Sequence, residues 1–325
     1  MLKMSKMLGL LWGLILFFAA QNSGAENDPA KIMSFEACNE CHNHKPNVAA
    51  WMQSTHFKTF QDMPRSDKAK EISTKLGIKR IRNEALCQTC HFTVQEVKGE
   101  PRAITGISCE SCHGAAKDWV EVHSAEGVDH EKRMADAEAK GMLRPSRVYQ
   151  VAQNCFQCHT VPEENLVNTG GHAVGSDFEL VAWSQGEVRH NLLYTEGKEN
   201  KEASPELKRV LYVTGRLLDL EFSLRALAKA TADGVYAQAM AARVTNAKTK
   251  LGEIKAKSPI PDVDAALKAV AGAELKPANA AALTAAADQV SASGKKFAEN
   301  DGSKLAAIDA LVPGKDAYKG AVFTP

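Results

Sequence analysis

Four short motifs contain every cysteine of the 325-residue chain. In each motif a histidine follows the second of two cysteines, in the pattern Cys-x-x-Cys-His. The motifs occupy residues 38–42, 87–91, 109–113 and 155–159. Two thiols at this spacing can add to the vinyl groups of a porphyrin as thioethers while the adjoining imidazole reaches the iron, which is the signature of c-type heme attachment. The sequence therefore predicts four covalently attached hemes c.

The predicted attachment residues are the eight cysteines, and the predicted proximal iron ligands are the motif histidines. The cysteines are Cys38, Cys41, Cys87, Cys90, Cys109, Cys112, Cys155 and Cys158, and the histidines are His42, His91, His113 and His159. Structural zinc sites of four thiolates and disulfides of an exported protein are the alternatives. Both are weaker, because neither requires a histidine after the second cysteine in all four motifs.

The first 25 residues have the pattern of an export signal. Lys3 and Lys6 precede an apolar run over residues 8–20, and small residues follow, which predicts cleavage after Ala25. The apolar run is short for a membrane span, so an uncleaved anchor is the minority alternative, and we expect no transmembrane span after cleavage. Because heme c is attached outside the bacterial cytoplasm, we expect a periplasmic protein, with an extracellular location as the alternative.

The amino-acid composition bears on two questions: whether nucleic acid is a partner, and whether side chains alone can form the core. The formal net charge of +1 gives no support for nucleic acid as a partner. Aromatic residues make up only 6 % of the chain, which is low for a self-standing core of this size. Hemes would supply the missing apolar bulk in the half that contains the cysteines.

The chain after the signal divides into two predicted domains, both without a convincing strand pattern, so the expected fold class is mainly α. Residues 26–200 hold all the cysteines and histidines and are expected to form a loop-rich multiheme cytochrome c domain. Residues 201–325 are rich in alanine and contain no Cys, His or Trp. Ser204 and Pro205 form a helix start, and apolar residues then recur at helical spacing, with further helices expected near residues 240–254, 262–271, 283–290 and 301–311. We interpret this part as an antiparallel helical bundle.

Four hemes have eight axial positions, and the motif histidines fill four of them. The remaining histidines are His44, His56, His123, His130, His172 and His190. His44 is too close to the first motif, and His130 lies in a charged run, so both are expected to face solvent. His56, His123 and His190 are the predicted distal ligands, because they lie in aromatic-containing stretches at useful distances from motifs. Counting alone does not show whether one iron stays open.

At this point the chain resembles the tetraheme cytochrome c-554 family. The residues that carry the resemblance are Trp51-x-x-Ser54-x-His56, the third motif with Gly114 and the following His123, the order of the four motifs and the distance from His159 to His190. The resemblance covers roughly residues 34–200 and does not extend to the helical C-terminal part.

The resemblance implies a crossed set of axial ligands. His123 would bind the first heme opposite His42, His56 the third heme opposite His113, and His190 the fourth heme opposite His159. The second heme, on His91, would then be five-coordinate and open to a small ligand. His172 is the alternative sixth ligand at that iron.

Electron transfer is the first functional hypothesis. Bis-histidine hemes keep their iron six-coordinate in both oxidation states, which suits a periplasmic carrier whose electron donor and acceptor are other redox proteins. The first alternative is reduction of nitric oxide or a related nitrogen oxide at an open iron on His91, for which the sequence identifies no proton donor. The second alternative is a subunit of an extracellular conducting filament.

Overall fold

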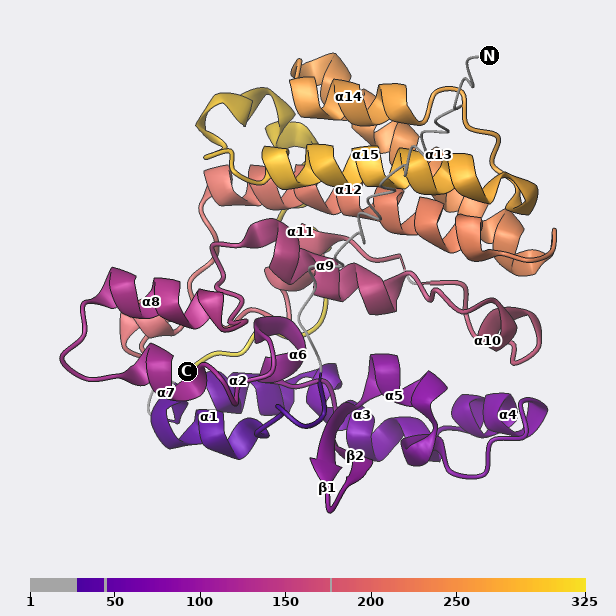
Figure 1. The fold of residues 1–325 in the computed structure, drawn as a ribbon. Helices are drawn as coiled ribbons and strands as arrows, with labels where there is room; N and C mark the ends of the chain where they lie inside the picture. The colour runs from indigo at the N-terminus through magenta and orange to yellow at the C-terminus, as the bar shows by residue number, and fades with distance from the viewer. Residues whose placement is uncertain (1–27, 44–45, 176) are drawn as a thin grey trace, which may run out of the picture.

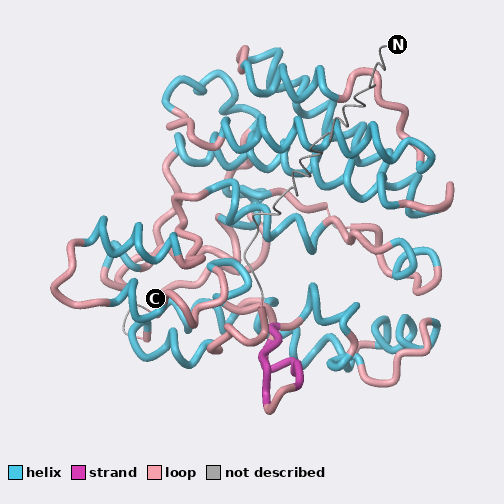
Figure 2. Tube along the Cα trace, in the orientation of Figure 1, coloured by secondary structure: helices cyan, strands magenta, loops and turns pink. Residues whose placement is uncertain are grey.

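The computed structural model describes residues 28–43, 46–175 and 177–325. The predicted export signal over residues 1–25 and His44 lie outside these residues. The protein is mainly α-helical, as the sequence predicts. In Figure 1 the short helices of the N-terminal half lie below the long helices of the C-terminal half, and Figure 2 shows how much of the lower part consists of loops.

Short helices separated by loops form the N-terminal half. They are α1 (Phe35–His42), α2 (Asn47–Gln53), α3 (Thr55–Asp62), α4 (Asp67–Lys75), α5 (Ala85–His91), α6 (Cys109–His113), α7 (Val120–Ser124), α8 (His130–Ala139), α9 (Val148–His159), α10 (Glu164–Asn168) and α11 (Leu180–Ser184). Short 3-10 turns occur at Met63–Arg65, Ile81–Asn83 and Leu193–Thr195.

Each Cys-x-x-Cys-His motif forms the end of a helix. The helices α1, α5, α6 and α9 all finish at the histidine of their motif. Residues three and four positions apart lie on the same face of an α-helix. The first thiol, the second thiol and the imidazole of a motif therefore face the same side, where one cofactor can meet all three.

A β-hairpin lies between the second and third motifs, where the sequence predicted no strand. Strands β1 (Thr93–Val97) and β2 (Glu100–Thr105) pair antiparallel. The two residues of the turn, Lys98 and Gly99, both have positive φ, at 56° and 80°, which is the backbone conformation that joins hairpin strands tightly. The strands lack a regular apolar alternation, so the period-2 signal was missing.

The C-terminal half is the predicted antiparallel bundle. Its helices are α12 (Pro205–Lys229), α13 (Val235–Lys257), α14 (Pro261–Ala269) and α15 (Ala280–Phe297), and α12 packs against both α13 and α15. The predicted helix start is confirmed, since the Ser204 hydroxyl accepts a hydrogen bond of 3.2 Å from the Leu207 amide. The segment Ser303–Leu311 is a 3-10 helix interrupted at Leu305, and further 3-10 turns lie at Pro277–Asn279 and Lys315–Ala317.

The largest hydrophobic core belongs to the bundle and extends into the N-terminal half. Val148 of α9 and Val181 of α11 are buried in the same cluster as the leucines of α12. By contrast, one cluster formed within the N-terminal half has only Ala116, Trp119 and Ala137 as its buried members.

The division of the chain at residue 200 stays a prediction. Among the described residues, no helix combines the length and apolarity required to cross a bilayer.

A buried polar contact fixes α9, and with it the fourth motif, to the bundle. Tyr149 is 1 % exposed, and its hydroxyl donates to the carboxylate of Glu221 on α12 and lies 2.8 Å from the Ser291 hydroxyl on α15. Glu221 is also paired with Arg225, with 2.9 Å between Oε1 and Nε. Burial and the Glu221 charge raise the pKa of Tyr149, so the phenol stays protonated and serves as the donor.

Tyr149→Phe should lower the free energy of unfolding of the holoprotein by about 1–3 kcal/mol, the range for hydrogen bonds to a charged or buried partner. The measurement is chemical denaturation followed by far-UV circular dichroism. Tyr236→Phe is the matched control, because the buried Tyr236 hydroxyl has no hydrogen-bond partner among the described residues, and its removal should cost little. Equal losses in the two variants would contradict the assignment.

Candidate heme centres

Four pairs of histidine rings face each other across gaps of almost equal width. The ring-centroid distances are 6.4 Å for His42–His123, 6.3 Å for His56–His159, 6.3 Å for His91–His172 and 6.2 Å for His113–His190. A metal-bound imidazole has its nitrogen about 2 Å from the ion, so two rings on opposite sides of one ion have centroids roughly 6 Å apart. Each pair combines one motif histidine with one histidine from outside the motifs, so the residues fit four hemes with two axial imidazoles each.

Hydrogen bonds at Nδ1 of the histidine rings leave the other ring nitrogen, Nε2, available to bind iron. In four histidines Nδ1 lies within hydrogen-bond distance of a backbone carbonyl, which can only accept, so Nδ1 carries the proton. These contacts are His113 with Leu143 at 2.9 Å, His123 with Val120 at 2.6 Å, His172 with Ala173 at 2.8 Å and His190 with Val188 at 2.8 Å. In the neutral form of each ring, the other nitrogen, Nε2, then has the free lone pair, and the backbone contact fixes the ring orientation.

Burial keeps several of these imidazoles neutral. It lowers the pKa of His91 to about 4, with His172 and His56 adding to the effect, and it lowers the pKa of His159 to about 4, with His56 and Arg243 adding to it. Burial also lowers the pKa of His113. Neutral imidazole is the form that binds a metal ion, so these rings are ready to bind near pH 7.

The structure brings together partly different histidines from those implied by the resemblance. His123 lies opposite His42, as implied, but His56 faces His159 and not His113. The His56 carbonyl accepts a hydrogen bond of 3.1 Å from the Ile107 amide, just before the third motif. A Cβ on Gly106 would lie 2.0 Å from that carbonyl oxygen, so this approach requires glycine. The backbone of His56 thus lies beside the third motif while its ring faces the fourth.

His190 is correspondingly placed opposite His113 and not opposite His159. The His190 carbonyl accepts a hydrogen bond of 3.0 Å from the Asn47 side chain on α2. This contact holds the backbone of His190 against the start of α2, the helix that follows the first motif. The implied pairing of His190 is therefore corrected as well, whereas its place among the predicted ligands is unchanged.

His172 faces the motif histidine that the resemblance leaves open. It lies in the loop after α10, and its amide donates to the Leu166 carbonyl at 3.1 Å. The centroid distance to His91 equals that of the other pairs. His130, in contrast, has a side chain that is 61 % exposed and pairs with the neighbouring Glu131.

Thiols of different motifs meet in pairs. A hydrogen bond joins the thiols of Cys38 and Cys109, raising the pKa of Cys38 and lowering that of Cys109. A second one joins Cys90 and Cys158, where it lowers the pKa of Cys90 and raises that of Cys158. The first motif is therefore next to the third, and the second is next to the fourth.

The third and fourth motifs are also neighbours. Burial raises the pKa of Cys155, and the nearby Cys112 adds to the effect. The Asn154 side chain donates to the Cys112 carbonyl at 3.1 Å. The motifs therefore follow one another in space in the order first, third, fourth, second.

A buried carboxylate inside the third motif holds the first motif in place. Glu110 is 1 % exposed and accepts backbone hydrogen bonds from Met33 and Ser34, both at 2.9 Å, and from Ala116 at 2.8 Å. The first two amides precede α1. One of the two variable positions of the third motif thus ties together the first and third motifs.

The zinc alternative has no candidate site in the part of the chain that the structure describes. No group of three or more His, Cys, Asp or Glu side chains there could hold a metal ion. Two facing histidines are sufficient when a porphyrin supplies the remaining four ligands. Disulfides between motifs would not account for the four histidine pairs.

Three buried arginine nitrogens test whether the surroundings of the motifs could hold the carboxylates of heme. Nε of Arg133, Arg189 and Arg216 is buried without a hydrogen-bond partner among the described residues. Arg133 is on α8, which packs against α7 with its His123, and Arg189 directly precedes His190. Heme carries two carboxylates, and the guanidinium group is well suited to bind carboxylates. These donors therefore fit the cofactor that the motifs predict.

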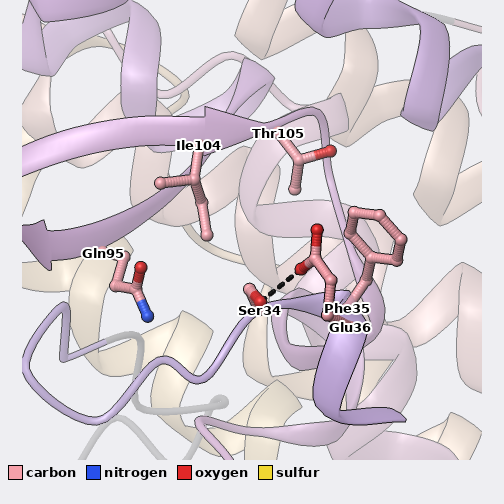
Figure 3. A pocket seen from close by; sticks show the side chains of 6 residues that line it. All are labelled: Ser34, Phe35, Glu36, Gln95, Ile104 and Thr105. Atoms are coloured by element: carbon pink, nitrogen blue, oxygen red, sulfur yellow. Dashed lines mark hydrogen bonds between the residues drawn. The ribbon is translucent and has the colours of Figure 1, made fainter. Parts of the chain in front are cut away.

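A small cavity lies beside the start of the first motif helix. It has a volume of about 300 Å³ and is lined by Ser34, Phe35 and Glu36 on one side and by Gln95, Ile104 and Thr105 of the hairpin on the other (Figure 3). The Ser34 hydroxyl donates to Glu36 across its mouth. The lining contains neither histidine nor cysteine, so we assign the cavity no role in iron binding.

Comparison with known proteins supports this interpretation of the motifs. Residues 37–114 match the family described as cytochrome c554 and c-prime. Cytochrome c-554 of Nitrosomonas europaea is 26 % identical over 130 residues, which cover 38 % of this chain and 54 % of that protein. The chain thus spans about half the length of the curated relative it matches. No solved structure matches the chain.

The matched family segment contains the first three motifs and ends just after His113. The C-terminal part is not covered. The resemblance seen in the motifs is confirmed by this match of residues 37–114 to the cytochrome c554 and c-prime family.

Proposed function

We propose that the protein is an exported tetraheme c-type cytochrome that carries electrons between other redox proteins. The observation that carries the proposal is the set of four facing histidine pairs, each with one motif histidine and a centroid distance of 6.2–6.4 Å. The family match over residues 37–114 supports c-type heme as the cofactor. When bound, heme supplies an iron that gains and loses a single electron.

The protein's own contribution is to hold each iron from both sides. Two imidazoles per iron would leave no position for substrate and would keep the coordination unchanged between oxidation states. They also lower the reduction potential relative to a His/Met pair. Backbone carbonyls that bind Nδ1 in His113, His123, His172 and His190 limit ring movement further. Such sites suit rapid electron exchange.

The order of the motifs in space gives the carrier two ends. The thiol pairs Cys38–Cys109 and Cys90–Cys158, and the hydrogen bond from Asn154 to the Cys112 carbonyl, support a series from the first motif through the third and fourth to the second. A donor and an acceptor would therefore meet the protein near the first and second motifs. The export-signal pattern of residues 1–25 favours the periplasm as the place of this exchange.

The alternative function, reduction of nitric oxide or a related nitrogen oxide at the second heme, requires an open iron on His91. His172 occupies the position opposite His91 at 6.3 Å. This contact favours a closed second iron and hence a carrier.

The purified protein should contain four hemes, and all four should be low-spin. Pyridine hemochrome analysis against protein concentration gives the heme number, and electron paramagnetic resonance of the oxidised protein gives the spin states. A stoichiometric high-spin signal in the unmodified protein would exclude four bis-histidine sites and restore the alternative function.

His172→Ala should convert one low-spin heme of the four into a high-spin heme without loss of covalent heme, because Cys87 and Cys90 remain. The same variant should gain binding of nitric oxide or carbon monoxide, followed by absorbance. His130→Ala is the matched control, since the His130 side chain is exposed and pairs with its neighbour Glu131. An unchanged spectrum for His172→Ala would remove His172 from the ligand set.

The ring angles allow the corrected pairing to be tested by the same spectroscopy. The planes of His113 and His190 are nearly perpendicular, at 86°, whereas those of His42 and His123 are nearly parallel, at 8°. Perpendicular imidazoles make two iron d orbitals almost equal in energy, so the third heme should give the most anisotropic low-spin signal. That signal should disappear in His190→Ala and persist in His56→Ala. The reverse result would restore the pairing of His56 with His113.

A further inference from the structure

A cavity lies between the loop that follows the fourth motif and the C-terminal bundle. Its volume is about 340 Å³, and its lining includes Phe178 from the loop side and Arg216, Asp219 and Arg243 from α12 and α13. It is therefore a place where the bundle meets the surroundings of a proposed heme.

The cavity wall is in direct contact with the fourth motif. The Phe178 ring stacks on the His159 ring, with 4.4 Å between centroids and 22° between planes. The Arg243 guanidinium donates to the His159 carbonyl at 3.2 Å. Packing is close here, because a Cβ on Gly175 would lie 2.4 Å from Arg243 Nη1 and 3.2 Å from the His159 carbonyl oxygen.

The two arginines of the cavity differ in their charge partners. Arg243 is paired with the buried carboxylate of Asp219, through Nε and Oδ1 at 2.5 Å. The Arg216 side chain is 15 % exposed, and its nearest paired carboxylate is Glu179, at 4.0 Å. Nε of Arg216 has no partner among the described residues. Asp177 and Asp219 also line the cavity, so Arg216 lies among carboxylates. Its buried Nε–H group nevertheless lacks an acceptor among the described residues, and an unsatisfied buried donor is destabilising.

We propose that Arg216, with Arg243 beside it, forms the cationic wall of the fourth heme site and binds a carboxylate side chain of that heme. This inference rests on the proposed function, since it requires a heme on His159. It gives the C-terminal bundle a role in the redox site itself: the bundle supplies the positive charge that sets the potential of one heme in the series.

Electrostatics predicts the direction in which Arg216 shifts the reduction potential of the fourth heme. Oxidised heme carries one more positive charge than reduced heme, so a nearby cation favours the reduced form. Removing the cation should favour the oxidised form and lower the midpoint potential of the fourth heme alone. We expect a change of about tenfold in the ratio of oxidised to reduced heme at fixed potential, which equals about 59 mV for a one-electron couple.

The test is a potentiometric titration of the full-length holoprotein, followed by absorbance and electron paramagnetic resonance. Arg216→Gln removes the charge, Arg216→Lys retains it, and Lys229→Gln removes an exposed cation further along α12. Thirteen residues separate Arg216 from Lys229, a distance of about 20 Å along the helix. The fourth heme is identified as the low-spin component that His56→Ala removes.

A lower potential of this component in Arg216→Gln, with values close to the unmodified protein in Arg216→Lys and Lys229→Gln, supports the proposal. Loss of the fourth heme in Arg216→Gln but not in Arg216→Lys supports it as well. An unchanged potential in Arg216→Gln, or the same shift in Lys229→Gln, overturns it. Failure of the proposed function would instead be visible in the unmodified protein, as fewer than four hemes or as a high-spin site.

Discussion

Each facing histidine pair joins two segments that are distant in sequence, and the rest of the N-terminal half depends on these connections. Ring centroids 6.2–6.4 Å apart make at most a weak aromatic contact, and an ion bound by both rings would make each pair a much stronger link. Apolar packing around the first three motifs is small: the cluster around Trp119 has three buried members, all alanine or tryptophan. The helices that carry these motifs are between five and eight residues long. Helices this short are unstable alone. The proposed hemes would thus fill the apolar interior of this half and would also join its segments to one another. Structural zinc has the same role in small domains that fold only with metal.

Contacts between the motifs decide which of the proposed hemes would be neighbours, and these contacts are made by the protein. Glu110 binds the amides that precede the first motif helix, and Asn154 binds the carbonyl of Cys112. Both residues lie within or beside a Cys-x-x-Cys-His motif. The variable positions of the motifs and the residues next to them therefore do more than separate the cysteines: they fix one attachment site against the next. A buried carboxylate that accepts three backbone amides is also a strong local constraint.

The local signals in the sequence were sufficient for the motifs, the helix start at Ser204 and the helical bundle, because each depends on neighbouring residues. The pairing of histidines was not predictable in this way. His56 illustrates the reason: its carbonyl is bound to the strand end before the third motif, while its ring faces His159. The direction in which a short helix faces depends on tertiary contacts, and the pairing inferred from the resemblance placed His56 and His190 opposite neighbours that differ from those in the structure. The orphaned Nε of Arg216 was also invisible, since an arginine in a mostly apolar helix pattern does not reveal its partners.

The bundle, which lies outside the family match, contacts the surroundings of two of the proposed heme sites. At the fourth site it contributes Arg216 and Arg243. At the second site it acts through α10: Glu164 accepts hydrogen bonds from the Thr231 amide at 2.7 Å and hydroxyl at 2.8 Å, and Asn168 accepts one from the Tyr236 amide at 3.0 Å. Thr231 and Tyr236 lie where α12 passes into α13, and the loop that follows α10 carries His172. The bundle thereby positions the one histidine that faces His91. If His172 closes the second iron as proposed, the helical half of the chain is what makes this protein a carrier, because it removes the open coordination position that ligand chemistry would need.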